Sequence, residues 1–425
     1  VLDLVANLNP VYCAEVIRAS VACAVGFANM PGAPTGLEVL DVGTGSQLQV
    51  NWNASPDPAV DHYNLYYSTD PAQMGNPILV QNVSYTLGNL TEGSLYHIQL
   101  AAVDALGNES YRPATTGTPW AVPLAPEDFT ETPLDHAIRL DWSPNQELDL
   151  AGYQLYKSTI PSQIGSPVST GLLTSNWYTD TQVSGSSQYY YYTVMALDTA
   201  GNPSPYTETL SSRPITLDQG ILIVDETRNM SGTSPFQPSD IQADSFYADL
   251  MQSYQTTQLD TDNSGEYLRL ADLCVYSSIL WHGNDTSEMD YPFYVKEALQ
   301  DYLEAGGNIL FSEYLPSQAF ELSSSYPAYF GPTTFINSTL GIASADHSNS
   351  ARFRYAIPQV AGYPALEVDS LKTTTAFSGH IIRVEGISPN AYSTSLYQYG
   401  SDYADNSPQG SLNDLPVGVL HQTSG

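Results

Sequence analysis

The chain has 425 residues, enough for about three domains of ordinary size. Only 13% of the residues are charged, about half of the share usual in soluble proteins, yet the formal net charge is −33. Because no segment is basic, every face would repel a phosphate backbone or an anionic membrane surface, which argues strongly against nucleic-acid binding.

The cysteines cannot form a disulfide framework. Cys13 and Cys23 fall in one predicted helix, about 15 Å apart along its axis, which is too far to bridge. Cys274 lies in an apolar run and is predicted to be a small buried hydrophobe. The balance of few charges and many Gly, Pro, Ser, Thr, Asn and Tyr residues is common in secreted bacterial β-proteins. We therefore expect an extracellular or cell-surface location.

Residues 1–30 contain one predicted helix, over residues 10–27, and a linker rich in Pro and Gly follows it. A lone amphipathic helix has nothing in so short a segment to cover its apolar stripe. Two interpretations are open: the helix packs on the next domain, or it is the last helix of an upstream domain that is cut away. Neither a signal peptide nor a transmembrane run is recognised, so no membrane insertion is expected.

Residues 9–12 (Asn-Pro-Val-Tyr), 15–19 (Glu-Val-Ile-Arg-Ala) and 24–27 (Ala-Val-Gly-Phe) resemble the closing helix of zinc-dependent N-acetylmuramoyl-L-alanine amidases. Those enzymes are peptidoglycan hydrolases. The resemblance implies that the full-length protein is an amidase whose zinc ligands precede Val1. It carries no catalytic motif into this chain, so no metal or other cofactor is predicted here.

Residues 34–119 and 123–214 repeat one pattern. Trp52 and Tyr63 of the first copy have counterparts in Trp142 and Tyr153, and each copy ends on an Asp-x-x-Gly-Asn turn. Apolar and polar residues alternate, as half-buried strands require. In the first copy the alternation predicts strands at residues 37–39, 48–52, 63–67, 85–87 and 96–102.

The repeated Trp, the Tyr-x-Leu-Tyr strand and the spacing from Leu90 to Tyr96 resemble the fibronectin type III domain over nearly the whole of both copies. The resemblance implies two immunoglobulin-like sandwiches, with Tyr96 as a tyrosine corner whose hydroxyl bonds the backbone. One extra residue before Tyr190 is expected to blur the corner of the second copy. The sandwich alone does not specify a function.

Four tyrosines stand in a row at residues 189–192. Because successive strand side chains face opposite ways, Tyr189 and Tyr191 are predicted to face solvent or a domain contact. They are candidates for stacking on sugar rings, and surface aromatics without a ligand are the simpler interpretation. Calcium is a second option for the loops between the second and third strands, where solvated carboxylates are the simpler interpretation of Asp57, Asp61, Glu147 and Asp149.

The spacing of apolar residues changes in residues 219–425. Continuous apolar runs at 220–225, 273–281 and 308–312 predict buried parallel strands, and helices are predicted from Asp240 and over 293–305. Residues 326–425 carry only short β-like runs, and the region is expected to be incomplete. The predicted fold class is thus multidomain: two all-β immunoglobulin-like sandwiches plus an α/β parallel-sheet domain.

Within that region, a helix that ends in Gly-Gly leads into a strand at residues 302–313, which resembles the class I glutamine-amidotransferase-like (flavodoxin-like) fold. In that fold the strand leads to a sharp elbow with a cysteine nucleophile. Here Ser312 or Glu313 falls at that place, which implies a degenerate domain kept for structure or binding. The alternative is a hydrolase that uses Ser312 or Glu313 with a histidine base, for which His282 is a candidate.

Ligands of parallel sheets bind at the carboxyl ends of the strands. The loops there supply candidates for ligand binding: Glu226, Arg228, His282, Asn284 and Asp285. A candidate for a metal site is the segment that begins like a calcium loop with Asp260, Asp262 and Ser264. Its twelfth position is an alanine instead of a bidentate acid, so the loop is incomplete.

These observations predict a non-catalytic spacer or binding region of a secreted or cell-surface bacterial protein, attached to a cell-wall or polysaccharide hydrolase. A cell-wall glycan or another polysaccharide is the expected partner, and the oligomeric state is left open. Two alternatives remain: the α/β domain is itself a hydrolase, or the whole chain is a structural stalk.

Overall fold

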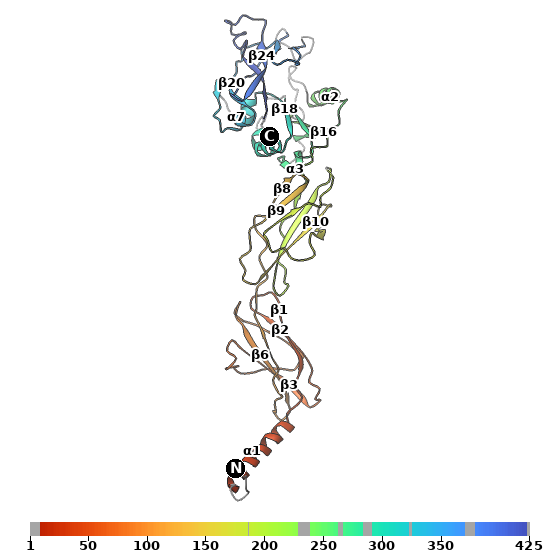
Figure 1. Cartoon of the computed structure of the whole chain (residues 1–425), viewed down its shortest axis with the longest axis vertical. Coiled ribbons are helices and arrows are strands. Elements are labelled where there is room, and N and C mark those ends of the chain that lie inside the picture. The colour runs from red at the N-terminus through yellow and green to blue at the C-terminus, as the bar shows by residue number, and fades with distance from the viewer. Residues whose placement is uncertain are drawn as a thin grey trace, which may run out of the picture.

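The molecule is elongated, with two β-sandwiches placed end to end between an N-terminal helix and a C-terminal region that contains the parallel sheet (Figure 1). The computed structural model describes residues 9–185, 187–227, 239–261, 267–283, 291–322, 325–369 and 379–422. The helix and the C-terminal region lie at opposite ends of the long axis, so the sandwiches separate them.

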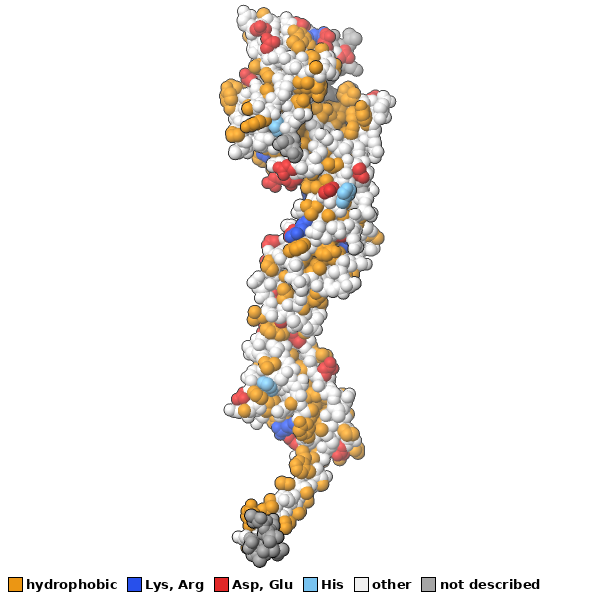
Figure 2. Space-filling view, viewed as in Figure 1, with side chains coloured by type: hydrophobic (Ala, Val, Ile, Leu, Met, Phe, Trp, Pro, Cys, Tyr) orange, Lys and Arg blue, Asp and Glu red, His pale blue; other side chains and the backbone are white. Residues whose placement is uncertain are grey.

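Helix α1 (Pro10–Ala28) projects from the first sandwich with none of its side chains buried, so it does not pack on that sandwich. Asn9 caps it by accepting hydrogen bonds from the N–H groups of Val11 and Tyr12. Hydrophobic side chains cover much of its length (Figure 2). Its only charged residues, Glu15 and Arg18, form an ion pair with each other.

Among the described residues, α1 is the one helix whose length and composition would suit a membrane span, with a mean hydropathy of 1.5. This differs from the expectation that the chain holds no such run. A signal sequence near an N-terminus meets the same criteria of length and composition.

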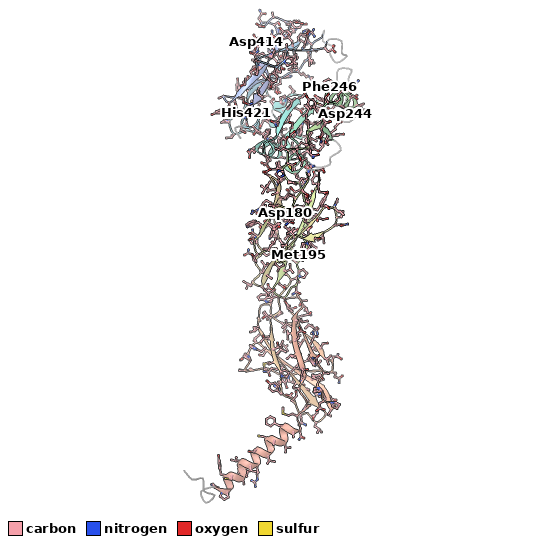
Figure 3. All side chains as sticks on the ribbon, turned by 45° about the vertical axis from the view of Figure 1, so that its right-hand side comes forward. Asp180, Met195, Asp244, Phe246, Asp414 and His421 are labelled. Carbon is pink, nitrogen blue, oxygen red and sulfur yellow. The ribbon has the colours of Figure 1, made fainter. Side chains whose placement is uncertain are left out.

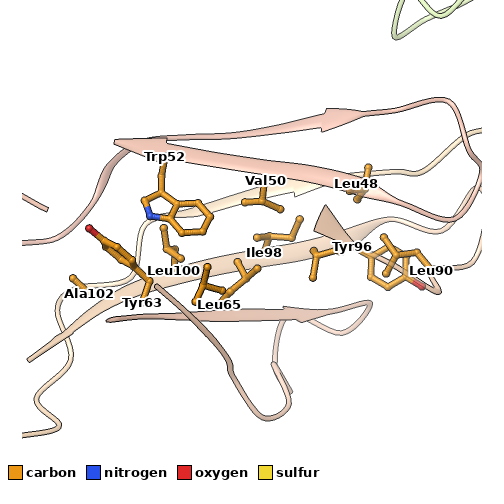
Figure 4. Close-up of a cluster of buried hydrophobic side chains, with 12 residues drawn as sticks. Leu48, Val50, Trp52, Tyr63, Leu65, Leu90, Tyr96, Ile98, Leu100 and Ala102 are labelled. Atoms are coloured by element: carbon orange, nitrogen blue, oxygen red, sulfur yellow. The ribbon is translucent and has the colours of Figure 1, made fainter. Parts of the chain in front are cut away.

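The first sandwich consists of two antiparallel sheets packed face to face (Figure 4). Inward residues of the strands form its core, where Leu48, Leu65, Ile98 and Leu100 are fully buried. The expected strands are confirmed, and two further short ones, β4 and β7, complete the second sheet. The strand order of the first sheet is β1 (Thr35–Asp41), β2 (Leu48–Asn53), β5 (Ser84–Leu87). The strand order of the second sheet is β4 (Ile78–Val80), β3 (Val60–Ser68), β6 (Tyr96–Asp104), β7 (Ala114–Gly117).

The second sandwich repeats the first strand for strand. Trp142 packs edge-on against Tyr153 with ring centroids 5.2 Å apart, as Trp52 packs against Tyr63 at 5.5 Å. The strand order of its first sheet is β8 (Thr130–Leu134), β9 (Ala137–Asp141), β12 (Trp177–Asp180). The strand order of its second sheet is β11 (Ser166–Pro167), β10 (Leu150–Ser158), β13 (Tyr190–Asp198), β14 (Leu210–Ser212).

Both sandwiches have a tyrosine corner. The Tyr96 hydroxyl accepts a hydrogen bond from the Thr91 N–H at 3.0 Å, five residues upstream. The Tyr190 hydroxyl accepts one from the Ser184 N–H at 2.7 Å, six residues upstream. The expectation of a blurred second corner is therefore wrong, because the loop absorbs the extra residue and the hydroxyl still reaches the backbone.

Residues 120–124 join the two sandwiches, and every backbone N–H group in them is hydrogen-bonded. The N–H groups of residues 120, 121 and 122 donate to the first sandwich, at Asp41, Glu92 and the Gly43 carbonyl. The N–H of residue 124 donates to Glu147 of the second sandwich at 2.7 Å, and residue 123 is proline. Hydrogen bonds to both sandwiches thus hold the connecting segment in place.

The second sandwich also contacts the C-terminal region directly, at helix α3 (Leu270–Leu273). Arg213 lies over the Tyr189 ring at 4.2 Å and donates to the carbonyls of Ala271 and Asp272, each at 2.8 Å. The Tyr189 hydroxyl donates to the Asp272 carboxylate. These contacts orient the C-terminal region relative to the sandwich before it.

Four parallel strands form the sheet of this region, in the order β16 (Thr256–Asp260), β15 (Ile221–Asp225), β17 (Ser278–Gly283), β18 (Asn308–Glu313). One face packs on a core of eleven buried residues that includes Trp281, Leu299 and Phe320, together with α5 (Lys296–Glu304) and α6 (Pro316–Glu321). On the other face, Tyr247 of α2 (Asp240–Leu250) packs on Ile223 and Leu280.

The predicted parallel strands are confirmed, but several predicted bounds are wrong. The apolar run at 273–281 begins in α3, and its strand starts only at Ser278, because a turn at residues 274–277 separates the two. The helix predicted over 293–305 is divided into α4 (Tyr291–Tyr294) and α5 at Val295. Helix α2 begins at Asp240, as predicted, and Ser239 is its N-cap, with its N–H donating to the Gln242 side chain.

Residues 325–422 add two antiparallel sheets beside the parallel one. Tyr399 and Leu412 are buried in the small core of the second of these. Helix α7 (Phe335–Ser338) packs between α6 and the first. The strand order of the first of these sheets is β19 (Ala328–Tyr329), β20 (Ile342–Asp346), β23 (Gly386–Pro389). The strand order of the second is β22 (Leu366–Glu367), β21 (Tyr355–Pro358), β24 (Ser393–Gly400), β25 (Pro416–His421).

Candidate functional site

The carboxyl ends of three parallel strands bring polar residues into one lateral row. Asp225 on β15 lies opposite His282 on β17, which lies opposite Ser312 on β18. Residues in register on parallel strands point to the same face, and here that face carries α2. Because β15 has β16 on one side and β17 on the other, the chain switches direction across the sheet here, which is where ligands bind in such folds.

An acidic cluster, composed of Asp225, Asp240 and Asp244, lies at this edge. One carboxylate oxygen of each residue lies within 4.8 Å of those of the other two. Asp240 and Asp244 are four residues apart on α2 and so share one face of the helix. Asp225 and Asp240 are buried, and Asp244 is half-buried. Figure 3 shows Asp244 on α2, next to the exposed Phe246.

His282 lies beside the acidic cluster and is fully buried. Its Nδ1 is 3.4 Å from Asp225 Oδ1 and 3.5 Å from the Thr227 hydroxyl. The Tyr247 ring stacks on the imidazole at a centroid distance of 3.8 Å. Its Nε2 has no hydrogen-bond partner among the residues that the structure describes.

The electrostatics of the site follow from its burial. Burial, together with the hydrogen bond to Asp244, raises the pKa of Asp225 to about 8. Burial lowers the pKa of His282 to about 4, although the nearby Asp244 acts in the opposite direction. At neutral pH the imidazole is therefore neutral and the Asp225 carboxyl is mostly protonated, because burial disfavours the charged form of both groups.

Ser312 and Glu313, the candidate nucleophiles, lie at the end of β18. Ser312 is exposed, and its Oγ accepts a hydrogen bond from the Tyr247 hydroxyl at 3.3 Å. No hydrogen bond joins it to His282 within the described part of the chain. The Glu313 carboxylate lies over Gly283, in space that a side chain at residue 283 would fill.

The turn after β18 passes through a residue in the left-handed backbone conformation, beyond the candidate residues. Leu315 has φ 50° and ψ 63°, immediately before α6. Its side chain is aliphatic and 7% exposed. The residue at this turn therefore has no group that can attack a substrate.

The structure brings only some of the predicted ligand-binding residues together. Glu226 and His282 lie side by side, since the Glu226 N–H donates to the His282 carbonyl at 2.9 Å and the Glu226 carboxylate accepts from Trp281 Nε1 at 2.9 Å. Arg228, Asn284 and Asp285 lie outside the described residues.

Asp260, the first residue of the predicted calcium loop, ends β16 opposite Asp225. It therefore borders the acidic cluster at the carboxyl edge of the sheet. Asp262 and Ser264 lie outside the described residues.

Tyr189 and Tyr191 alternate with the buried Tyr190 and Tyr192, as the strand geometry predicts. Tyr189 is at a domain contact, with Arg213 over its ring and its hydroxyl on Asp272. Tyr191 is half-buried on β13. Among the loop carboxylates, Asp149 is not solvated but 6% exposed.

A separate pocket of about 540 Å³ lies at the junction of the two sandwiches. It combines an indole ring and aliphatic side chains with carboxylates and side-chain amides. The residues that argue for a ligand here are Trp120, Leu124, Glu127, Gln146 and Leu148.

Sequence reasoning missed Asp240, Asp244 and Tyr247 as parts of a site. The signal that was available is the spacing of the two aspartates, which places them on one helix face, directly after a strand that ends in Asp225. That helix packs with this face on the end of β15, and a single sequence does not reveal this packing.

The fibronectin type III domain is the family whose profile matches this chain, over residues 32–118. Because the second sandwich repeats the same sheets, both sandwiches have this fold. Among solved structures, the FN1–FN3 domains of chicken CNTN1 are similar at 15% identity over 44% of this chain and 68% of that one, with a TM-score of 0.35. A two-domain fibronectin type III segment of chicken tenascin is similar at 19% identity over 43% and 99%, with a TM-score of 0.23.

Two bacterial enzymes are similar in sequence. Exoglucanase B of Cellulomonas fimi is 28% identical over 193 residues, which are 43% of this chain. Chitinase A1 of Niallia circulans is 29% identical over 181 residues, which are 40% of this chain. The matches span only 16% and 24% of these two relatives.

Proposed function

We propose that this chain is a non-catalytic spacer and binding region of a secreted or cell-surface bacterial protein that acts on polysaccharide. The main observation in support of the proposal concerns residues 120–124, which connect the two sandwiches. Each backbone N–H group of these residues is hydrogen-bonded to one of the sandwiches. A flexible tether would leave these groups to water, whereas a spacer that holds its ends apart needs them fixed.

The class of the parent protein is supported by the two relatives. Both are named as enzymes of polysaccharide breakdown, an exoglucanase and a chitinase, and this chain matches only a minor part of each. Such a part is consistent with an accessory module instead of the catalytic one. The proposed full-length protein is therefore a cell-wall or polysaccharide hydrolase, with these sandwiches next to its catalytic domain.

A glycan contact is proposed at the junction pocket. Trp120 offers an aromatic ring for the apolar face of a sugar, and Glu127 and Gln146 offer hydrogen-bonding groups for its hydroxyls. The low content of charged residues suits a neutral polymer. The same pocket lies between two sandwiches whose relative position is fixed, so a bound chain would run across the junction.

Retention on insoluble cellulose, chitin and peptidoglycan tests this function, with bound protein measured after washing. We expect retention on at least one polymer, and a loss of at least fivefold in Trp120→Ala. The matched control is Trp177→Ala, because Trp177 is an exposed tryptophan of the second sandwich outside the pocket. No retention on any of the three polymers would remove the binding role and leave the spacer role.

The hydrolase alternative finds less support in the geometry. A serine nucleophile needs a base within hydrogen-bond reach, and Ser312 is bonded to Tyr247 instead. An activity screen that compares the unaltered chain with Ser312→Ala and His282→Ala decides the matter. We expect equal rates in all three, and a loss confined to the two variants would establish the hydrolase.

A further inference from the structure

We infer that the acidic cluster of Asp225, Asp240 and Asp244 is a binding site for Ca²⁺, which ties the start of α2 to the carboxyl end of β15. The inference is independent of the spacer role, because it concerns only the parallel sheet and its covering helix.

The first argument is the geometry of the oxygens. Three carboxylates from two elements each place one oxygen within 4.8 Å of the others. Ca²⁺ accepts irregular arrangements of carboxylate oxygens, whereas Mg²⁺ demands near-ideal octahedral geometry and usually keeps several of its waters. A cluster of carboxylate oxygens held by protein side chains therefore favours a hard cation, and Ca²⁺ over Mg²⁺.

A second observation, independent of the carboxylates, comes from His282. Its side chain is completely buried, and the ring edge that carries Nδ1 faces Asp225 at 3.4 Å. Its Nε2 finds no hydrogen-bond partner in the described part of the chain. A buried ring nitrogen without a partner is costly unless the site holds a further group that supplies one.

The electrostatic state of the cluster agrees with these observations. Asp225 is 1% exposed and Asp240 is 8% exposed, so both carboxylates are held out of water at close range to Asp244. A divalent cation would neutralise these charges and offset the cost of holding them out of water.

The cation would act on the attachment of α2. Only Asp240, Ala243 and Tyr247 of this helix are buried, so few apolar contacts hold it against the sheet. A Ca²⁺ ion bound by two residues of its first turns and one residue of β15 would fix the end of the helix that Tyr247 does not reach. The carboxyl edge of the sheet would then be rigid only in the presence of Ca²⁺.

Calorimetric titration of the full chain with CaCl₂, after treatment with EDTA, tests the site directly. We expect Ca²⁺ binding with a dissociation constant on the order of 10⁻⁴–10⁻³ M, as in extracellular modules, and weaker binding of Mg²⁺. Asp244→Asn and Asp225→Asn should each weaken Ca²⁺ binding at least tenfold. Hydrogen exchange of the α2 amides should slow on addition of Ca²⁺ in the unaltered chain and not in the variants.

The control is Asp249→Asn, which removes the same charge from an exposed position of the same helix. It should bind Ca²⁺ as the unaltered chain does. Far-UV circular dichroism shows whether each variant is folded, and Asp225→Asn keeps the oxygen that accepts from the Thr227 N–H. The proposal is overturned if the unaltered chain binds no Ca²⁺ at 5 mM, which is roughly five times the weakest expected dissociation constant. It is also overturned if Mg²⁺ binds as tightly as Ca²⁺, or if Asp244→Asn binds Ca²⁺ as well as Asp249→Asn does.

Discussion

Two leucines on either side of α6 adopt the left-handed backbone conformation, and they differ in burial. Leu315 has φ 50° and is 7% exposed, whereas Leu322 has φ 54° and is 49% exposed. The left-handed region costs a leucine about 1–2 kcal/mol, which the fold tolerates at Leu315 because its side chain is buried.

Glycine at these two positions should therefore act in opposite directions. Leu322→Gly removes strain and little packing, so we expect a stabilisation of about 0.5–1 kcal/mol after the entropic cost of glycine. Leu315→Gly removes the same strain but also a buried side chain worth about 2–5 kcal/mol, so we expect a net loss of about 1–3 kcal/mol. Calorimetric unfolding of the two variants measures both. A stabilised Leu315→Gly would contradict the packing role of Leu315.

Glu385 supplies the clearest pH dependence outside the acidic cluster. Burial raises its pKa above the ordinary value, although the N–H and the hydroxyl of Ser317 both donate to it and oppose the shift. The folded state therefore binds a proton more tightly than the unfolded chain. Its contribution to stability is complete below about pH 4.5 and is lost as the pH rises through the folded pKa.

We expect Glu385→Gln to become more stable relative to the unaltered chain as the pH rises from 4.5 to 7. Glutamine keeps an oxygen for the Ser317 N–H and has no proton to lose. Thermal unfolding at intervals over this range, with Glu304→Gln as an exposed control on α5, measures the difference. A stability difference that stays constant with pH would show that Glu385 does not titrate in this range.

At the scale of elements, α2 is the helix whose behaviour the sequence describes least well. The apolar spacing predicts that five side chains share one side: Phe246, Tyr247, Leu250, Met251 and Tyr254. Tyr247 is buried and Met251 is half-buried, whereas the other three are 57–62% exposed. The helix covers one face of β15 and β17 and leaves Leu310 on β18 62% exposed, so its own apolar surface is wider than the surface that it contacts.

Because Tyr247 alone supplies a large buried side chain, its loss should release α2 locally. We expect Tyr247→Ala to cost about 3–5 kcal/mol of local stability, and Tyr247→Phe, which loses only the hydrogen bond to Ser312, about 1 kcal/mol. Hydrogen exchange of the α2 amides measures this, with the β6 amides of the first sandwich as the internal control. Equal exchange in Tyr247→Ala and the unaltered chain would mean that other contacts hold the helix.

The strands of the sandwiches and three of the four parallel strands could be predicted from the sequence, because their patterns are local. Strict alternation around Trp52 and Trp142 sets the sandwich strands, and the continuous run ending in Asp225 sets a parallel strand. The candidate site could be predicted only in part. Glu226 and His282 follow from the rule that ligands bind at strand ends, but Asp240 and Asp244 reach the site through the docking of α2, and β16 is too polar to stand out as a strand.

At the scale of the whole molecule, the junction between the sandwiches decides whether the chain can act as a spacer. Gly43 is central to it, because it has φ +70° and a Cβ there would lie 2.6 Å from Val122 and 3.3 Å from Asn202 of the second sandwich. Gly43 thus permits the close approach of the first sandwich to the linker and the second sandwich.

Gly43→Ala should therefore disturb the relative position of the two sandwiches. Gly107→Ala is the matched control, since Gly107 also has a positive φ, +88°, and a Cβ there would contact nothing within 4 Å. Both variants carry the same kind of backbone strain, so a difference between them reports the junction. We expect a changed interdomain distance, by double electron–electron resonance between labels on the two sandwiches, in Gly43→Ala only. Identical distances in the two variants would contradict the role of Gly43.

Small-angle X-ray scattering of the unaltered chain tests the spacer account most directly. The account predicts an asymmetric pair-distance distribution with a long tail, matching the end-to-end arrangement in Figure 1, unchanged between low and high salt. A symmetric distribution from a folded-back chain, or the broad distribution of sandwiches that move freely about residues 120–124, would contradict it.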